Sequence, residues 1–147
     1  MKYIQTVLQG KTNIVFITLL VIAIAFTSCA SKLRFNTSSV VPAAEGTVKV
    51  KKDDNNNYNI KISLSNLAAP DRLQPSKKMY IVWMEADDQV NKNIGQINTS
   101  TGFLSGKLKA DFETVSATKP IRIFITAEDD ANVQYPDSRV VLSTNQF

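Results

Sequence analysis

Apolar and polar residues alternate with a period of two through much of the chain after Gly46. "TVKVKK", residues 47–52, sets two valines against charged neighbours. "NYNIKISLSNL", residues 57–67, alternates in the same way, and its apolar face consists of Tyr58, Ile60, Ile62 and Leu64. Because successive side chains of a strand point to opposite faces, both segments are predicted to be half-buried strands. The turn formers "DDNNN" between them predict a hairpin.

Two later segments predict central strands. "KMYIVWMEA", residues 78–86, is apolar on both faces, as expected of a strand that is covered on each side. "KPIRIFITAE", residues 119–128, alternates isoleucines with Arg122, Phe124 and Thr126. "NIGQIN" and "GFLSGKLKADF" predict shorter edge strands or a hairpin, and "SRVVLST" closes the domain.

Helical periodicity of 3.6 residues is not convincing after the first 28 residues. The best helical candidate is "LSGKLKADFETV", residues 104–115, which its glycine and β-branched residues weaken. Roughly six to eight short strands at regular spacing indicate a sandwich. We therefore expect an all-β fold, an immunoglobulin-like antiparallel β-sandwich of about seven strands that covers residues 45–147.

The N-terminal residues follow a different pattern. Residues 1–13 carry two lysines and no acid, Ile14 to Phe26 form an apolar run, and the small residues Thr27 and Ser28 follow. This order predicts a signal peptide over residues 1–28. A spanning helix needs about 20 apolar residues, although the uncharged stretch from Thr12 to Ser31 leaves an uncleaved anchor as an alternative.

The only cysteine of the chain, Cys29, comes directly after this leader. The sequence Phe26-Thr27-Ser28-Cys29 resembles the lipobox of bacterial lipoproteins. The resemblance implies that diacylglycerol is attached to the thiol, that the leader is removed, and that Cys29 becomes an acylated N-terminus in the bilayer. Two or more acyl chains give stable attachment. A buried thiol, or a chance cysteine beside an ordinary cleavage site, is the alternative.

The residues after Cys29 indicate the membrane to which such a lipoprotein would be sent. Ala30-Ser31-Lys32 contains neither the aspartate at +2 that retains enterobacterial lipoproteins in the inner membrane nor the acidic cluster of lipoproteins exported to the surface in the Bacteroidetes. The resemblance therefore implies a cell-membrane lipoprotein on the outer membrane, facing the periplasm. Residues 29–44 are small, polar or interrupted by Pro42, and we expect them to form a tether, although "SSVVPAA" is an alternative first edge strand.

Composition excludes several classes of function. The chain has no histidine and one cysteine, which removes Cys/His metal sites, Ser/His triads and intrachain disulfides. Without Lys2 and Lys11, 15 basic residues stand against 13 acidic ones, a net charge of +2. Nucleic-acid binding is not expected at such a charge, and no cofactor is expected either.

A second resemblance covers roughly residues 58–144. It is carried by Ser65-Asn66-Leu67, Met79 to Trp83, Gly95, Pro120 to Glu128, and Pro136 followed by "VVLS". This succession is similar to the extracytoplasmic domain of anti-sigma-K-type factors, which implies an immunoglobulin-like sandwich outside the cytoplasm. The chain has no sigma-binding domain ahead of its membrane segment, and "DDANVQYPD" replaces the family's glycines. A direct anti-sigma role is therefore not expected.

Three acidic groups are candidates for a site, and they are Asp53/Asp54, Glu85/Asp87/Asp88 and Glu128/Asp129/Asp130. Paired carboxylates bind calcium or cleave glycosides. If the strands that end in Glu85 and Glu128 are antiparallel neighbours, these two groups lie at opposite ends of the domain. What remains is a weak calcium loop in "EDDANVQYPD", with Asp129, Asp130 and Asp137 as donors.

Two further features have structural explanations. Trp83 is a candidate platform for sugars, but inside an apolar strand we expect it in the core. Lys49, Lys51, Lys52 and Lys61 suit an acidic partner or lipid headgroups, but we prefer the explanation that they protect an edge hairpin from strand addition.

These observations predict a non-enzymatic binding, scaffolding or envelope-stress accessory module. Its partners are the lipid bilayer, through acylated Cys29, and an unknown envelope protein or ligand. The alternatives are a calcium-dependent adhesive module and a hydrolase that uses carboxylates alone.

Overall fold

A computed structural model describes residues 31–97 and 109–147 of the chain. Antiparallel strands dominate these residues, joined by turns and by one short 3₁₀ helix, η1. The elements are β1 (Ser31–Arg34), β2 (Glu45–Lys52), β3 (Tyr58–Ser65), η1 (Pro70–Arg72), β4 (Met79–Ala86), β5 (Asn91–Ile97), β6 (Lys109–Ser116), β7 (Pro120–Glu128) and β8 (Val140–Ser143).

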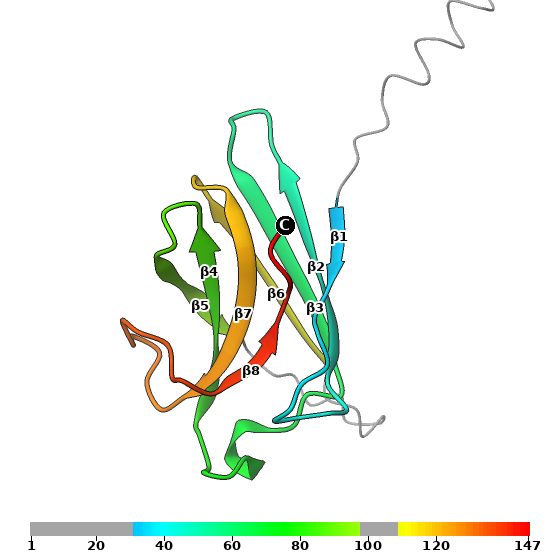
Figure 1. Cartoon of the computed structure of the whole chain (residues 1–147), viewed down its shortest axis with the longest axis vertical. Helices are drawn as coiled ribbons and strands as arrows, with labels where there is room; N and C mark the ends of the chain where they lie inside the picture. The colour runs from blue at the N-terminus through cyan, green and yellow to red at the C-terminus, as the bar shows by residue number, and fades with distance from the viewer. Residues whose placement is uncertain (1–30, 98–108) are drawn as a thin grey trace, which may run out of the picture.

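The strands form two four-stranded sheets that face each other (Figure 1). Sheet A has the order β1-β2-β3-β6 and sheet B the order β5-β4-β7-β8, and all neighbours are antiparallel. The chain crosses between the sheets after β3, β5 and β6, as in immunoglobulin-like sandwiches. The predicted all-β sandwich is confirmed.

The main core lies between the sheets and follows from the alternation in the sequence. The inward positions of β3 and β7 are apolar and buried, whereas outward residues of β3 such as Lys61 and Ser63 are exposed. The buried side chains of these two strands include Ile60, Ile62, Leu64, Ile123, Ile125 and Ala127. Tyr80 joins the core from β4, and its hydroxyl donates to the carbonyl of Ala68 at 2.9 Å.

A second apolar layer covers the outer face of sheet B. Ile81, Trp83 and Phe124 pack there under the β7–β8 connection, and the Trp83 and Phe124 rings stack with centroids 6.2 Å apart. This layer explains why β4 is apolar on both faces, because one face meets the main core and the other meets the connection. Trp83 is buried as predicted, but outside the inter-sheet core.

The expected tether, residues 29–44, is folded from Ser31 onward. β1 pairs with β2 through four residues, and the backbone of Asn36 then donates to the carbonyl of Ser143 in sheet B. Val41 and Ala44 belong to the main core. The first edge strand is therefore residues 31–34 rather than "SSVVPAA", because the apolar side chains at 33 and 35 pack inward against the core.

Differences at the other strands are smaller. Residues 109–116, which overlap the candidate helix 104–115 and the expected edge strand 102–112, form β6, in which exposed and more buried positions alternate. Residues 98–108 lie outside the described part of the chain. The "DDNNN" hairpin is confirmed, with Asn56 at φ 65° in its turn.

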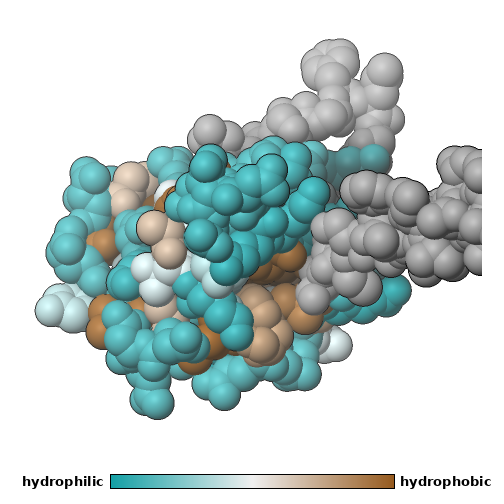
Figure 2. Space-filling model, turned by 90° about the horizontal axis from the view of Figure 1, so that it is seen from above, coloured by the Kyte–Doolittle hydropathy of each residue, from teal (hydrophilic) through white to brown (hydrophobic). Residues whose placement is uncertain are grey.

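The sandwich has two distinct ends (Figure 1). The N-terminal pole carries the start of β1 and the turns at residues 53–57, 87–90 and 117–119. The distal pole carries the longer connections at residues 35–44, 66–78 and 129–139. Figure 2 looks onto the N-terminal pole and shows a mostly hydrophilic surface with apolar residues between.

Candidate functional site

Cys29, the expected lipid-attachment residue, lies outside the described residues, but the fold starts close to it. β1 begins at Ser31, so that only Ala30 separates the cysteine from the sheet. Two residues of extended chain span about 7 Å at most. Any group attached to Cys29 is therefore held beside the N-terminal pole.

The two acidic strand ends do not form one site. β4 and β7 are antiparallel neighbours, in which Glu85 pairs with Arg122 and Glu128 pairs with Met79. Six residues along a strand place Glu85 and Glu128 about 20 Å apart. This separation exceeds the roughly 5 to 10 Å between the carboxyl groups of glycosidases. The predicted placement at opposite ends is confirmed.

The acidic residues near the N-terminal pole already have partners. The Glu85 carboxylate lies 2.9 Å from Nε of Arg122. Asp88 accepts a hydrogen bond from the backbone of Val90, and this bond, helped by Lys92, lowers the pKa of Asp88. These contacts stabilise the end of β4 and the turn after it.

Two of the three calcium candidates, Asp129 and Asp137, contact a lysine instead of forming an open cation site. Nζ of Lys77 lies 3.2 Å from Asp129 and 3.3 Å from Asp137. Asp130 instead accepts a hydrogen bond from the backbone of Asn132 within the loop. In residues 31–97 and 109–147 no three acidic, cysteine or histidine residues are grouped so as to hold a metal. Asp129, Asp130 and Asp137 thus do not form the expected calcium loop.

This lysine belongs to a set of contacts that joins two connections of the distal pole. The hydrogen bonds that Lys77 donates to Asp129 and Asp137 raise the pKa of Lys77, and the hydrogen bond that the backbone N–H of Arg139 donates to Asp137 lowers the pKa of Asp137. The Arg139 guanidinium also donates to the carbonyls of Gln74 and Pro75. Residues 74–77 and 129–139 are therefore held together.

A buried chain of hydrogen bonds fixes the β7–β8 connection over Trp83. The indole Nε1 donates to Oγ1 of Thr126 at 2.8 Å, and this hydroxyl donates to Oε1 of Glu128 at 2.6 Å. The same carboxyl oxygen accepts the backbone N–H of Asp137 at 2.8 Å. Because Trp83 is fully buried under the connection, its ring is not available as a sugar platform.

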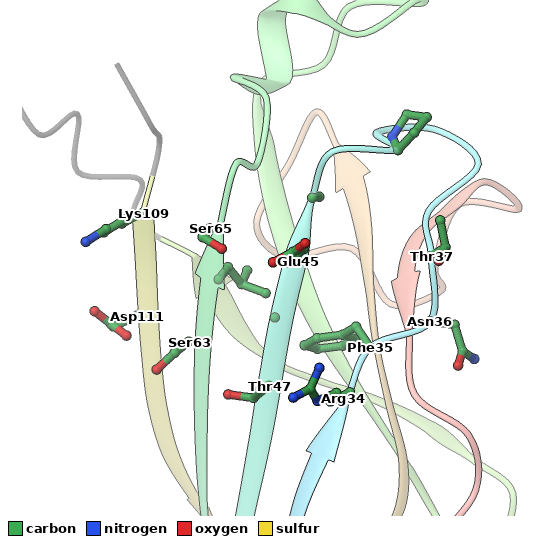
Figure 3. A pocket seen from close by; sticks show the side chains of 14 residues that line it. Arg34, Phe35, Asn36, Thr37, Glu45, Thr47, Ser63, Ser65, Lys109 and Asp111 are labelled. Carbon is green, nitrogen blue, oxygen red and sulfur yellow. The ribbon is translucent and has the colours of Figure 1, made fainter. Parts of the chain in front are cut away.

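The outer face of sheet A is hollowed near the distal pole, with a volume of about 630 Å³ (Figure 3). Its floor carries the hydroxyls of Thr47, Ser63 and Ser65 on the adjacent strands β2 and β3. Charged residues of both signs surround these hydroxyls, and they are Arg34, Glu45, Lys109 and Asp111. The hollow therefore suits a polar ligand bound by hydrogen bonds and charge.

The two carboxylates of the hollow come from strands that are not neighbours. Glu45 and Asp111 lie on β2 and β6, with β3 between them. In the register, Glu45 is level with Ser65 and Asp111 is level with Ser63. Their Cα atoms are thus about 12 Å apart by sheet spacings.

Neither the hollow nor the lysine contact corresponds to a sequence motif. Part of the lining of the hollow is predictable from the sequence, because Ser63 and Ser65 alternate with Ile62 and Leu64 and must face away from the core. No comparable sequence pattern predicts the contacts of Lys77. This lysine meets Asp129 only because the loop before β4 and the loop after β7 share one pole.

Comparison of the chain with family models, curated proteins and solved structures finds no match. No helix within residues 31–97 and 109–147 is long and apolar enough to cross a bilayer.

Proposed function

We propose that this chain is a bacterial lipoprotein anchored to the membrane through acylated Cys29. Its β-sandwich acts outside the cytoplasm as a non-enzymatic binding or scaffolding module. The order of basic residues, apolar run, small residues and cysteine supports the anchor. The start of β1 at Ser31 supports it further, because a folded domain follows the cysteine almost immediately.

A binding role is favoured by the contrast between polar groups that are paired within the fold and polar groups that are open at the surface. Glu85, Glu128, Asp129 and Asp137 are each held by another residue, so that they contribute to the fold. The hollow on sheet A instead presents hydroxyls and charges at an open surface. An envelope protein or a polar envelope ligand is the proposed partner. The similarity to anti-sigma-K-type factors makes an envelope-stress accessory role the proposed setting.

The proposed location is the outer membrane, on the face toward the periplasm. The support is the absence of acidic residues from Ala30-Ser31-Lys32. In a density-gradient separation of membranes, the protein should sediment with the outer membrane and remain protected from protease added to intact cells.

Mass spectrometry of the N-terminal peptide tests the anchor. The mature protein should begin at Cys29 and carry the mass of its acyl chains. Cys29→Ala should leave the protein unlipidated. As a matched control, Cys29→Ala combined with Ser31→Cys keeps one cysteine but moves it out of position, and it should also remain unlipidated. Recovery of an intact 1–28 leader in the mature protein would contradict the proposal.

A further inference from the structure

A row of lysines crosses the outer face of sheet A near the N-terminal pole. Lys32 on β1 pairs with Lys49 on β2, which pairs with Lys61 on β3. Lys51 lies two residues beyond Lys49 and therefore on the same face. All four side chains are exposed. We call Lys32, Lys49, Lys51 and Lys61 the basic strip.

Protection of a sheet edge does not explain the basic strip. β1 and β6 are the edges of sheet A, so that Lys49 and Lys61 lie on interior strands. The expected explanation as guards of an edge hairpin is therefore wrong for Lys49 and Lys61, whereas Lys51 and Lys52 lie beyond the last pair of β1 and β2, Ser31 with Val50. Like charges directly opposite each other destabilise a strand pair, and here two such pairs are adjacent.

Little within the described residues compensates this repulsion. Lys61 forms an ion pair with Glu113 at 2.8 Å, with both side chains more than half exposed. Exposed pairs of this kind contribute little to stability. No ion pair of Lys32, Lys49 or Lys51 is present among residues 31–97 and 109–147. The strip thus has the charge that an anionic partner would neutralise.

The strip lies beside the attachment point. Lys32 is three residues from Cys29, and Lys49 and Lys51 flank Val50, the partner of Ser31. A bilayer that holds Cys29 therefore lies within reach of these long side chains. Attraction to an anionic surface acts over about 8 Å at physiological ionic strength.

The charges at the N-terminal pole decide the orientation. Its turns carry Asp53, Asp54, Asp87 and Asp88 against a single lysine, Lys119, so that they are net negative and an anionic surface would repel them. The outer face of sheet A presents the lysines beside that pole. Val115 also lies on this face, in register with Asn59, and its side chain is 58% exposed. An exposed valine beside lysines suits the boundary between headgroups and acyl chains.

We propose that the basic strip docks on anionic lipid headgroups and tilts the sandwich, so that the N-terminal part of the outer face of sheet A meets the bilayer while the hollow near the distal pole stays clear of it. The inference rests on the proposed acylation of Cys29, which brings the strip to the surface. Sheet B and its covering connection then face away from the membrane.

Lysine footprinting on vesicles tests the docking. The acylated, processed protein is reconstituted into vesicles of phosphatidylcholine alone or of phosphatidylethanolamine with phosphatidylglycerol. An amine-reactive reagent is added, and mass spectrometry measures the modification of each lysine. Lys32, Lys49 and Lys51 should be protected only on the vesicles with phosphatidylglycerol, and added salt should remove this protection. Lys78, at the distal pole, should react equally on both.

Charge variants sharpen the test, with Lys61 as the reporter. Replacing Lys32, Lys49 and Lys51 by glutamine should weaken docking about hundredfold, or about 3 kcal/mol at 1.4 kcal/mol per tenfold change. Lys61 should then react equally on both vesicle types. The matched control replaces Lys78, Lys92 and Lys119 by glutamine, which removes the same charge elsewhere. In this control Lys61 should stay protected.

The outcomes separate the docking from the anchor. Acylated protein with equal lysine reactivity on both vesicle types overturns the docking and leaves the proposed function intact. Equal protection on both types also overturns it, because anionic headgroups then play no part. An N-terminal peptide without acyl mass overturns both proposals.

Discussion

Thr126 lies at the centre of the hydrogen-bond chain that fixes the β7–β8 connection over sheet B. Its hydroxyl accepts from the Trp83 indole and donates to Glu128, and the residue is fully buried. Thr126→Val keeps the shape of the side chain and removes both bonds. The substitution therefore tests whether polar contacts, and not apolar packing alone, hold this layer in place.

The expected cost has two parts. The indole N–H of Trp83 would remain buried without an acceptor, which costs about 1 to 3 kcal/mol. Glu128 would lose one donor, at about 1 kcal/mol. We therefore expect Thr126→Val to lower the free energy of unfolding by about 2 to 4 kcal/mol, a large part of the stability of about 5 to 15 kcal/mol that is typical of domains.

A double-mutant cycle with Trp83→Phe isolates the indole bond. In the W83F background, Thr126→Val leaves no indole donor behind and should cost about 1 to 2 kcal/mol less than in the wild type. Urea unfolding should be followed by far-ultraviolet circular dichroism, because Trp83 is the only tryptophan and W83F removes the fluorescence signal. Thr118→Val, in an exposed turn, is the control and should change stability by less than about 0.5 kcal/mol.

Two results would refute this reasoning. One is a cost of Thr126→Val no larger than that of Thr118→Val. The other is the same cost in the wild-type and W83F backgrounds, which would show that the indole bond contributes nothing. Tryptophan emission of the T126V variant adds a direct observation, since a shift to longer wavelength would show that water has reached Trp83.

Two further predictions concern the lysine between the distal connections. The pKa of Asp137 is lowered from its ordinary value of 3.8, so its contribution to stability is present above that pH and is lost as the pH falls through the lower, folded value. The urea midpoint should therefore fall in this acidic range for the wild type and less steeply for Asp137→Asn, and superimposable pH profiles would exclude this account. Calcium should leave the thermal unfolding temperature unchanged, because Lys77 already forms ion pairs with both Asp129 and Asp137. A calcium-dependent rise that Asp129→Asn abolishes would restore the calcium site.

Strands with a clear period of two were predictable from the sequence. Ile60, Ile62 and Leu64 point into the core because their neighbours are polar, and this contrast fixes the face of β3 and the register of its hairpin. The opposite placement of Glu85 and Glu128 followed from the same logic, because each ends a strand in the centre of the domain. These are local patterns that need no knowledge of distant contacts.

Features made by distant segments were not predictable in this way. A strand with apolar residues on both faces is predicted to be buried on both sides. The pattern does not say which part of the chain packs on the face that carries Trp83. The sequence of residues 31–44 is short of apolar alternation, yet it folds because β2 and the main core provide its partners. The hollow on sheet A combines residues from β1, β2, β3 and β6, whose proximity depends on the strand order.

The difference between the two poles bears on how a partner would bind. The proposed attachment through Cys29 would place the short turns of the N-terminal pole near the bilayer and leave the longer connections 35–44, 66–78 and 129–139 at the far end. Bonds from Lys77 and Arg139 already join two of these connections. A surface that is ordered before binding loses little conformational entropy when it is occupied, which favours affinity. Under the proposed attachment, the distal pole therefore lies away from the membrane and has a preformed shape. A module that presents a binding surface in the envelope requires both properties.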